Sequence, residues 1–241
     1  KPVVLKRAYM LRNILEHMTI YIEPQTLLAG NQASANRAAP IFPEYAMDWV
    51  MEELDRFEKR DGDVFYITEE TKEKLRELAP YWEHNTTKDR GLAAMPESSR
   101  IFYDLGIIKA EGNITSGDAH LAVEYEKVMR LGLKDYERRT REAMERLELT
   151  EAENLKKFYF YQAILIVIEA VRNFASRYSE LALAQAAGLE KGEPDEMRRA
   201  AELREMARIL SKVPYEPAES FAEALQSMWL IHLVLQIESN G

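Results

Sequence analysis

An acid and an imidazole two residues apart are the feature of this sequence best suited to chemistry. Asp118 and His120 belong to the segment Thr115-Ser116-Gly117-Asp118-Ala119-His120. In an extended segment both side chains would point to one face, where they could hold a hydroxylated substrate or act as an acid/base pair. Alternatively, Asp118 caps the helix that follows and His120 lies on the surface of its first turn. The residues by themselves favour the structural role.

The other histidines are interpreted as structural. His17 and His232 lie within predicted helices, where one hydrogen-bond partner satisfies a histidine. His84 follows a predicted helix end, a position at which side chains cap the last carbonyl groups. The aromatic run 158–161 has helical spacing with the apolar residues after it, which predicts core packing.

The composition excludes several function classes. The 241 residues include no cysteine, so the chain offers no disulfide, no thiolate metal site and no thiol nucleophile. The 41 acidic residues outnumber the 32 basic residues, a balance that argues against a nucleic-acid partner. The sequence carries no glycine-rich phosphate-binding motif, zinc-protease motif or serine-hydrolase motif. We expect no metal to be bound by this chain.

No targeting or membrane segment is evident from the pattern. The longest uninterrupted apolar runs are far shorter than the roughly 20 residues that cross a bilayer, and the charged N-terminus does not resemble a signal peptide. We expect a soluble, cytoplasmic protein. The chain starts without methionine and stops directly after an apolar segment, which indicates a piece of a longer protein.

The elements that must position these residues are mostly helices. Thr26–Asn31 has the composition of a short strand that ends on the turn residue Gly30. The stretch from Tyr81 to Gly117 lacks a clear period and is predicted to be irregular. The fold class is therefore mainly α with one or two short strands. Apolar periodicity and capping residues predict helices over 3–19, 44–57, 68–79, 121–133, 136–147, 150–188, 194–213 and 221–238.

The order of several sequence blocks carries a family resemblance. The chain resembles the N-terminal part of glycyl radical enzymes of the pyruvate formate-lyase type. The similarity is greatest to the branch with glycerol and propanediol dehydratases and choline trimethylamine-lyase. The blocks, in family order, are Arg7-Ala8 with Leu27-Leu28-Ala29-Gly30-Asn31, Pro43-Glu44-Tyr45, Leu75 to Trp82, His120 with Tyr125 to Gly132, Phe160 to Ala163 with Phe174 to Tyr178, and Ala224-Leu225-Gln226 to Gly241.

The resemblance implies a fold and a chemistry for the parent protein. The parent fold would be a ten-stranded α/β barrel wrapped by helices, with residues 1–241 as its N-terminal helical part. A glycyl radical near the C-terminus, installed by a separate radical activase, would oxidise a cysteine to a thiyl that abstracts hydrogen from the substrate. The cysteine loop and the glycyl radical domain would lie outside these residues. This chain alone is therefore predicted to be inactive, and the full-length protein to be a homodimer that binds no nucleic acid or membrane.

The resemblance also assigns substrate-binding residues. In the diol dehydratases a histidine of the matching block hydrogen-bonds a substrate hydroxyl, and His120 occupies that position. Asp118 is included by adjacency. The chain has Ala119 where relatives usually have glycine and Glu124 where many have aspartate, which leaves the substrate open. We expect the parent to eliminate water or another leaving group from a small polyol or amino-alcohol.

Two alternatives remain at this point. The chain could be a non-catalytic helical scaffold or interaction module of the same ancestry. It could also belong to a pyruvate formate-lyase (formate acetyltransferase), which would need an adjacent cysteine pair elsewhere in the protein. The sequence of the remaining reading frame would separate these alternatives from a dehydratase.

Overall fold

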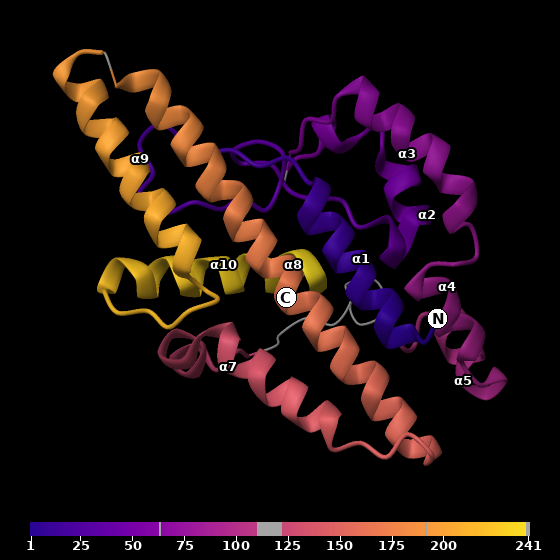
Figure 1. Cartoon of the computed structure of the whole chain (residues 1–241). Coiled ribbons are helices and arrows are strands. Elements are labelled where there is room, and N and C mark those ends of the chain that lie inside the picture. Colours follow the sequence, from indigo (N-terminus) through magenta and orange to yellow (C-terminus); the bar gives the residue numbers. More distant parts are fainter. Residues whose placement is uncertain (63, 110–121, 191, 240–241) are drawn as a thin grey trace. The chain divides into compact units, whose positions relative to one another are not determined.

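Helices form the regular structure of the chain (Figure 1). The computed structural model describes residues 1–62, 64–109, 122–190 and 192–239. Contacts divide the chain into two units, which are described separately. The first contains Lys1–Asn36 and Ala122–Glu238, and the second contains Arg37–Leu121 and Ser239–Gly241.

A long central helix organises the first unit. It packs along one flank against the first helix of the chain and along another against the helix that follows it. Their shared core buries Leu15, Phe174, Tyr178, Leu203 and Leu230 almost completely. The helices of this unit are α1 (Val3–His17), α7 (Tyr125–Glu145), α8 (Ala152–Leu189), α9 (Pro194–Lys212) and α10 (Phe221–Ser239).

The second unit has a smaller core of its own. Met47, Val50, Leu54 and Leu75 are buried together there. The predicted start of a helix at Thr68 is confirmed, since Thr68 is the N-cap and its hydroxyl accepts a hydrogen bond from the Thr71 N–H at 3.2 Å. The elements of this unit are α2 (Pro43–Glu53), η1 (Phe57–Lys59), α3 (Glu69–Trp82), α4 (Thr87–Ala94) and α5 (Glu97–Asp104).

The prediction of one or two short strands was wrong, because no residue in the described ranges belongs to a β-strand. The segment Thr26–Asn31 has no regular secondary structure and bends at Leu27 and Leu28, and its hydrogen-bond partners lie on helices. The Gln226 side chain accepts from the Ala29 N–H and donates to the Ala29 carbonyl, each at 2.9 Å. The Asn31 N–H donates to the Tyr178 hydroxyl at 2.9 Å. Side chains of α8 and α10 thus satisfy the backbone groups that a neighbouring strand would have satisfied.

Two further predictions need correction in the second unit. Helix α3 continues past Pro80 to Trp82, since a proline in the last turn removes only one hydrogen bond. The stretch predicted to be irregular contains α4 and α5. Helix α4 begins with a capping box in which Thr86 and Asp89 each bond the other's backbone N–H. That local signal was present in the sequence and was overlooked.

Gly132 interrupts α7 shortly before the predicted break between residues 133 and 136. Its backbone has φ 68° and ψ 167°, a conformation that only glycine adopts readily. The Leu133 and Lys134 N–H groups donate to the carbonyls of Pro214 and Tyr215, each at 2.9 Å. The break in α7 therefore forms the contact with the loop that connects α9 to α10.

The length and hydropathy of helix α8 are relevant to the prediction that the chain has no membrane-spanning segment. By length and composition, its 38 residues suffice to cross a bilayer, with a mean hydropathy of 1.2 over the relevant window. Among the helices that the structure describes, it alone passes that test. Many of its apolar residues, including Phe174 and Ala182, are buried against α1 and α9 in the core of the first unit. A core helix has the same composition as a spanning one, so this helix is weak evidence for a membrane.

A buried carboxylate joins α9 to α10. Glu223 is 3% exposed and contacts Lys212 Nζ at 2.8 Å and Arg208 Nη1 at 3.1 Å. The Glu223 carboxylate also accepts a hydrogen bond from the Glu219 N–H at 2.8 Å. The Glu223 N–H donates to the Ser220 hydroxyl, which caps the start of α10. Burial raises the pKa of the Glu223 carboxyl, but the hydrogen bonds from Lys212, Glu219 and Arg208 lower it more, to about 2.

The lowered pKa of Glu223 predicts acid-dependent stability. Its stabilising contribution is complete above the carboxyl's ordinary pKa of 4.5 and is lost as the pH falls towards about 2. In urea unfolding, wild-type protein should therefore lose about 2 kcal/mol more than Glu223→Gln between pH 6 and pH 2. The matched control is Glu219→Gln, whose 81% exposed side chain also pairs with Lys212. It should change stability by less than about 0.5 kcal/mol. Parallel pH profiles for wild type and Glu223→Gln would contradict the prediction.

Candidate functional site

The residues with predicted roles in substrate binding, His120 and Asp118, lie outside the described residues. The predictions for the other histidines can be compared with the structure. His17 Nδ1 bonds the Asn13 carbonyl at 2.8 Å, and His232 Nδ1 lies 3.4 Å from the Tyr125 hydroxyl. Both are helix histidines with one partner, as predicted. His84 has a left-handed φ of 62° directly after α3, and its imidazole is exposed.

The described residues contain no cluster of three or more histidine, aspartate or glutamate side chains suited to a metal ion. This observation concerns only those residues. The structure instead shows two concave sites in the first unit, one apolar and one polar.

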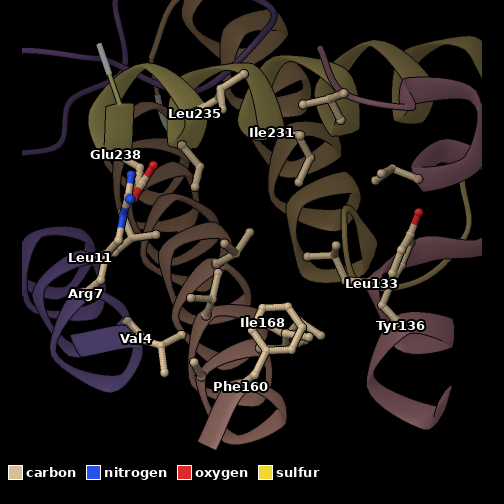
Figure 2. Close-up of a pocket in the computed structure, with 18 of the residues that line it drawn as sticks. Val4, Arg7, Leu11, Leu133, Tyr136, Phe160, Ile168, Ile231, Leu235 and Glu238 are labelled. Atoms are coloured by element: carbon tan, nitrogen blue, oxygen red, sulfur yellow. The ribbon is translucent and has the colours of Figure 1, made fainter. Parts of the chain in front are cut away.

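The apolar site is a groove of about 580 Å³ that involves α1, α7, α8 and α10 (Figure 2). Helix α8 runs along its floor and carries Phe160 and Ile168. Val4 and Leu11 on α1 form one wall, Leu133 and Tyr136 on α7 form the other, and Ile231 and Leu235 on α10 close one end. We call this site the apolar groove.

Charged groups occur only at the margins of the apolar groove. Arg7 on α1 forms an ion pair with Glu238 on α10. Glu124 pairs with Lys127 at 3.1 Å. No residue in the lining is a histidine, and no lining pair forms a nucleophile with a base. The groove can therefore bind apolar groups.

None of the aromatic residues 158–161 is fully buried, so the prediction of core packing holds only for Tyr159, which packs against a small core cluster. Phe160 is 53% exposed at the apolar groove, whereas Phe158, Tyr159 and Tyr161 are half-buried. The periodicity identified an apolar helix face correctly. It could not show that one part of this face lacks a partner within the first unit.

A buried polar network connects the segment around Asn31 to helices α8 and α10 of the first unit. The Tyr178 hydroxyl donates to Asn31 Oδ1, and Asn31 Nδ2 donates to the carbonyls of Thr19 and Ala33, both at 2.8 Å. Burial raises the pKa of Tyr178 well above its ordinary value, which keeps the hydroxyl a proton donor. Together with Gln226, these side chains bind the segment Thr26–Asn31 to α8 and α10.

The polar site is a cleft of about 510 Å³ whose lining comes from α7, α8 and Tyr215. The Tyr215 hydroxyl donates to Glu137 Oε2 at 3.0 Å. The Arg141 guanidinium, 2.7 Å from Glu137, holds the pKa of that carboxyl below its ordinary value. Arg172 lies over the Tyr215 ring, 4.4 Å from its centre. These charges compensate one another, which is typical of a structural ion-pair cluster.

Sequence reasoning did not identify the polar network or the apolar groove as sites. Gln226 was an available signal, because it is an amide side chain within the largely apolar helix α10. A buried amide in such a helix needs specific partners. Nothing local in the sequence indicates that its partner is Ala29.

Comparison with known proteins identifies the family. Residues 1–241 match the family model for pyruvate formate lyase-like proteins. The chain therefore belongs to the pyruvate formate lyase-like family, which confirms the resemblance seen in the sequence.

Individual relatives support the same assignment. The chain is 41% identical over its whole length to the probable dehydratase YbiW of Escherichia coli, and spans 29% of that protein. It is 31% identical to (2S)-3-sulfopropanediol dehydratase of Klebsiella oxytoca, again spanning 29% of it. The glycerol-bound B12-independent glycerol dehydratase of Clostridium butyricum superposes with a TM-score of 0.94 at 36% identity. That match covers 100% of this chain and 30% of the other.

Proposed function

We propose that this chain is the N-terminal helical part of a glycyl radical lyase of the dehydratase type. The observation that carries the proposal is the match of the entire chain to a glycerol dehydratase at a TM-score of 0.94. The names of other relatives include dehydratases and an isethionate sulfite-lyase. The proposed reaction is loss of water or another leaving group from a small polyol or amino-alcohol.

The composition indicates which part of the polypeptide carries the radical chemistry in this proposal. The 241 residues include no cysteine, so a thiyl radical must come from elsewhere in the polypeptide. The glycyl radical would likewise lie outside these residues, and a radical activase would install it. Within this proposal the present helices exclude water from the radical site and carry substrate-binding residues. The complete protein would be a cytoplasmic homodimer.

We propose His120 and Asp118 as the substrate-binding residues of this chain. Their types suit a hydroxylated substrate, because an imidazole N–H donates to an oxygen and a carboxylate accepts from a hydroxyl. The resemblance of the His120 block to the diol dehydratases supports the assignment.

Activation of the complete protein tests the function. The product of the complete reading frame should be incubated anaerobically with its activase, S-adenosylmethionine and a one-electron reductant for the activase. We expect a glycyl radical signal in electron paramagnetic resonance and carbonyl product from glycerol or 1,2-propanediol. The 241-residue chain should give neither. A reading frame without a cysteine loop and a C-terminal glycine loop, or an adjacent cysteine pair with pyruvate cleavage, would refute a dehydratase.

The substrate role of His120 can be measured in the same assay. His120→Gln should lower kcat/KM by about 10- to 100-fold, because a glutamine amide cannot reproduce the position of the hydrogen bond that the imidazole is proposed to make to the substrate. Radical yield should be unchanged, which separates substrate binding from misfolding. His84→Gln is the matched control, since the His84 side chain is 88% exposed. Equal kinetics for His120→Gln and His84→Gln would remove His120 from the site.

A further inference from the structure

We propose that His232 and Tyr125 are positioning residues for the dehydratase reaction. Their contact holds the start of α7, which follows directly in the chain on the segment that contains His120. The inference rests on the proposed function and deepens it, because it states what places the proposed substrate donor. Both positioning residues belong to the first unit.

The first observation is the contact between α7 and α10. The Tyr125 hydroxyl lies 3.4 Å from His232 Nδ1, and both side chains are half-buried. A phenol hydroxyl can donate to Nδ1 of a neutral imidazole. Tyr125 is the first residue of α7, and the N-cap residue Glu124 makes no side-chain capping bond to this described helix. The contact with His232 thus holds a helix start that a side-chain cap does not fix.

The second observation is the setting of His232 in α10. It is a polar residue among the apolar residues from Trp229 to Val234, where a half-buried imidazole needs a partner. The His232 ring lies against the Trp229 ring, with the two centroids 5.9 Å apart. Trp229 in turn approaches Gly30 so closely that a Cβ on this glycine would lie 2.9 Å from Trp229 Nε1. These close neighbours restrict the orientation of the imidazole that contacts Tyr125.

The third observation is the short length of chain between Tyr125 and His120. His120 precedes Tyr125 by five positions, and five residues span at most about 18 Å in any conformation. A fixed Tyr125 therefore limits the volume in which the imidazole of His120 can lie. Misplacing a substrate-binding group by about 1 Å can cost much of the catalytic efficiency. The Tyr125 hydroxyl would therefore affect turnover through His120 and not through the substrate itself.

Tyr125→Phe in the product of the complete reading frame tests the positioning role. The substitution removes the hydroxyl and keeps the ring, so the fold and the radical yield should be retained. For whichever of glycerol and 1,2-propanediol the wild type converts, we expect kcat/KM to fall about 10-fold, mainly through a higher KM. The matched control is Tyr159→Phe, since Tyr159 is also half-buried but packs its ring against a core cluster. It should keep wild-type kinetics.

A double-variant cycle separates positioning from a general effect on the fold. If Tyr125 acts through His120, Tyr125→Phe should lower kcat/KM no further once His120→Gln is present. If Tyr125 only stabilises the protein, the two losses should multiply. Multiplying losses would overturn the proposal.

Two substitutions of His232 test the other partner. The carboxamide oxygen of asparagine can replace Nδ1 as an acceptor, so His232→Asn should keep most of kcat/KM. His232→Leu cannot accept a hydrogen bond and should show the same loss as Tyr125→Phe. Equal kinetics for His232→Asn and His232→Leu would contradict a role for this hydrogen bond.

The outcomes distinguish this inference from the proposed function. A wild-type protein that carries the radical but converts neither diol would refute the proposed function, and the positioning role with it. Conversion by the wild type together with unchanged kinetics in Tyr125→Phe would refute the positioning role alone. A loss in Tyr125→Phe without any loss in His120→Gln would also refute it, because Tyr125 could not then act through His120.

Discussion

Gly132→Ala should lower the free energy of unfolding by about 4 kcal/mol. The backbone of Gly132 has φ 68° and ψ 167°, where a residue with a Cβ is strained. A Cβ at this position would lie 2.3 Å from the Tyr215 carbonyl oxygen and 2.9 Å from the Pro217 nitrogen. Both are backbone atoms, so no side-chain rotation relieves the clash. Urea unfolding measures the loss.

The location of the damage distinguishes this explanation from general instability. The Leu133 and Lys134 amides should lose protection in hydrogen exchange, because their acceptors in Pro214 and Tyr215 must move. Gly188→Ala is the matched control. A Cβ at Gly188 of α8 would meet no atom within 4 Å, so that variant should gain about 0.5 kcal/mol from helix propensity. Equal effects of the two substitutions would show that the contact between α7 and the 214–217 loop is not rigid.

Gln226→Met should cost about 4 kcal/mol, because it leaves two buried backbone groups without partners. Methionine nearly preserves the length of the side chain but lacks the amide. Ala29 is 1% exposed, and the Gln226 amide satisfies both its N–H and its carbonyl at 2.9 Å. Water cannot readily replace the amide in so buried a place. Urea unfolding and hydrogen exchange of the peptide that contains Ala29 measure the effect.

The matched control for Gln226→Met is Gln162→Met on α8. Gln162 is half-buried, and its substitution should change stability by less than about 0.5 kcal/mol. If Gln226→Met lowered the stability as little as Gln162→Met, the hydrogen bonds of Tyr178 and Asn31 alone would hold the segment Thr26–Asn31 in place. The proposed function would be unaffected, because Gln226 serves the fold.

Local signals in the sequence predicted most helices well. The apolar period and the acidic start at Glu151 predicted α8, and Gly188 was correctly identified as lying at its end. The Ser220 hydroxyl caps α10 at the start of the predicted helix 221–238, whereas Gly132 interrupts α7 inside the predicted helix 121–133. Caps, glycines and helical periods act over a few residues, which is why they can be interpreted without a structure. The predicted helix end before Pro80 was wrong, because a proline in the last turn of a helix removes only one hydrogen bond and destabilises the helix little.

The sequence by itself determined the helical class and the family, because helix periods and the order of short blocks are properties of the linear chain. The tertiary structure decided the rest. Ala29 pairs with Gln226, 197 positions away, so an apparent strand became a segment held by helices. Phe160 belongs to an apolar helix face in the sequence, but only the convergence of α1, α7, α8 and α10 shows that this face borders an open groove. Contacts between residues far apart in the sequence decide both the Ala29–Gln226 pairing and the exposure of Phe160. A local sequence pattern does not specify which distant residues come into contact.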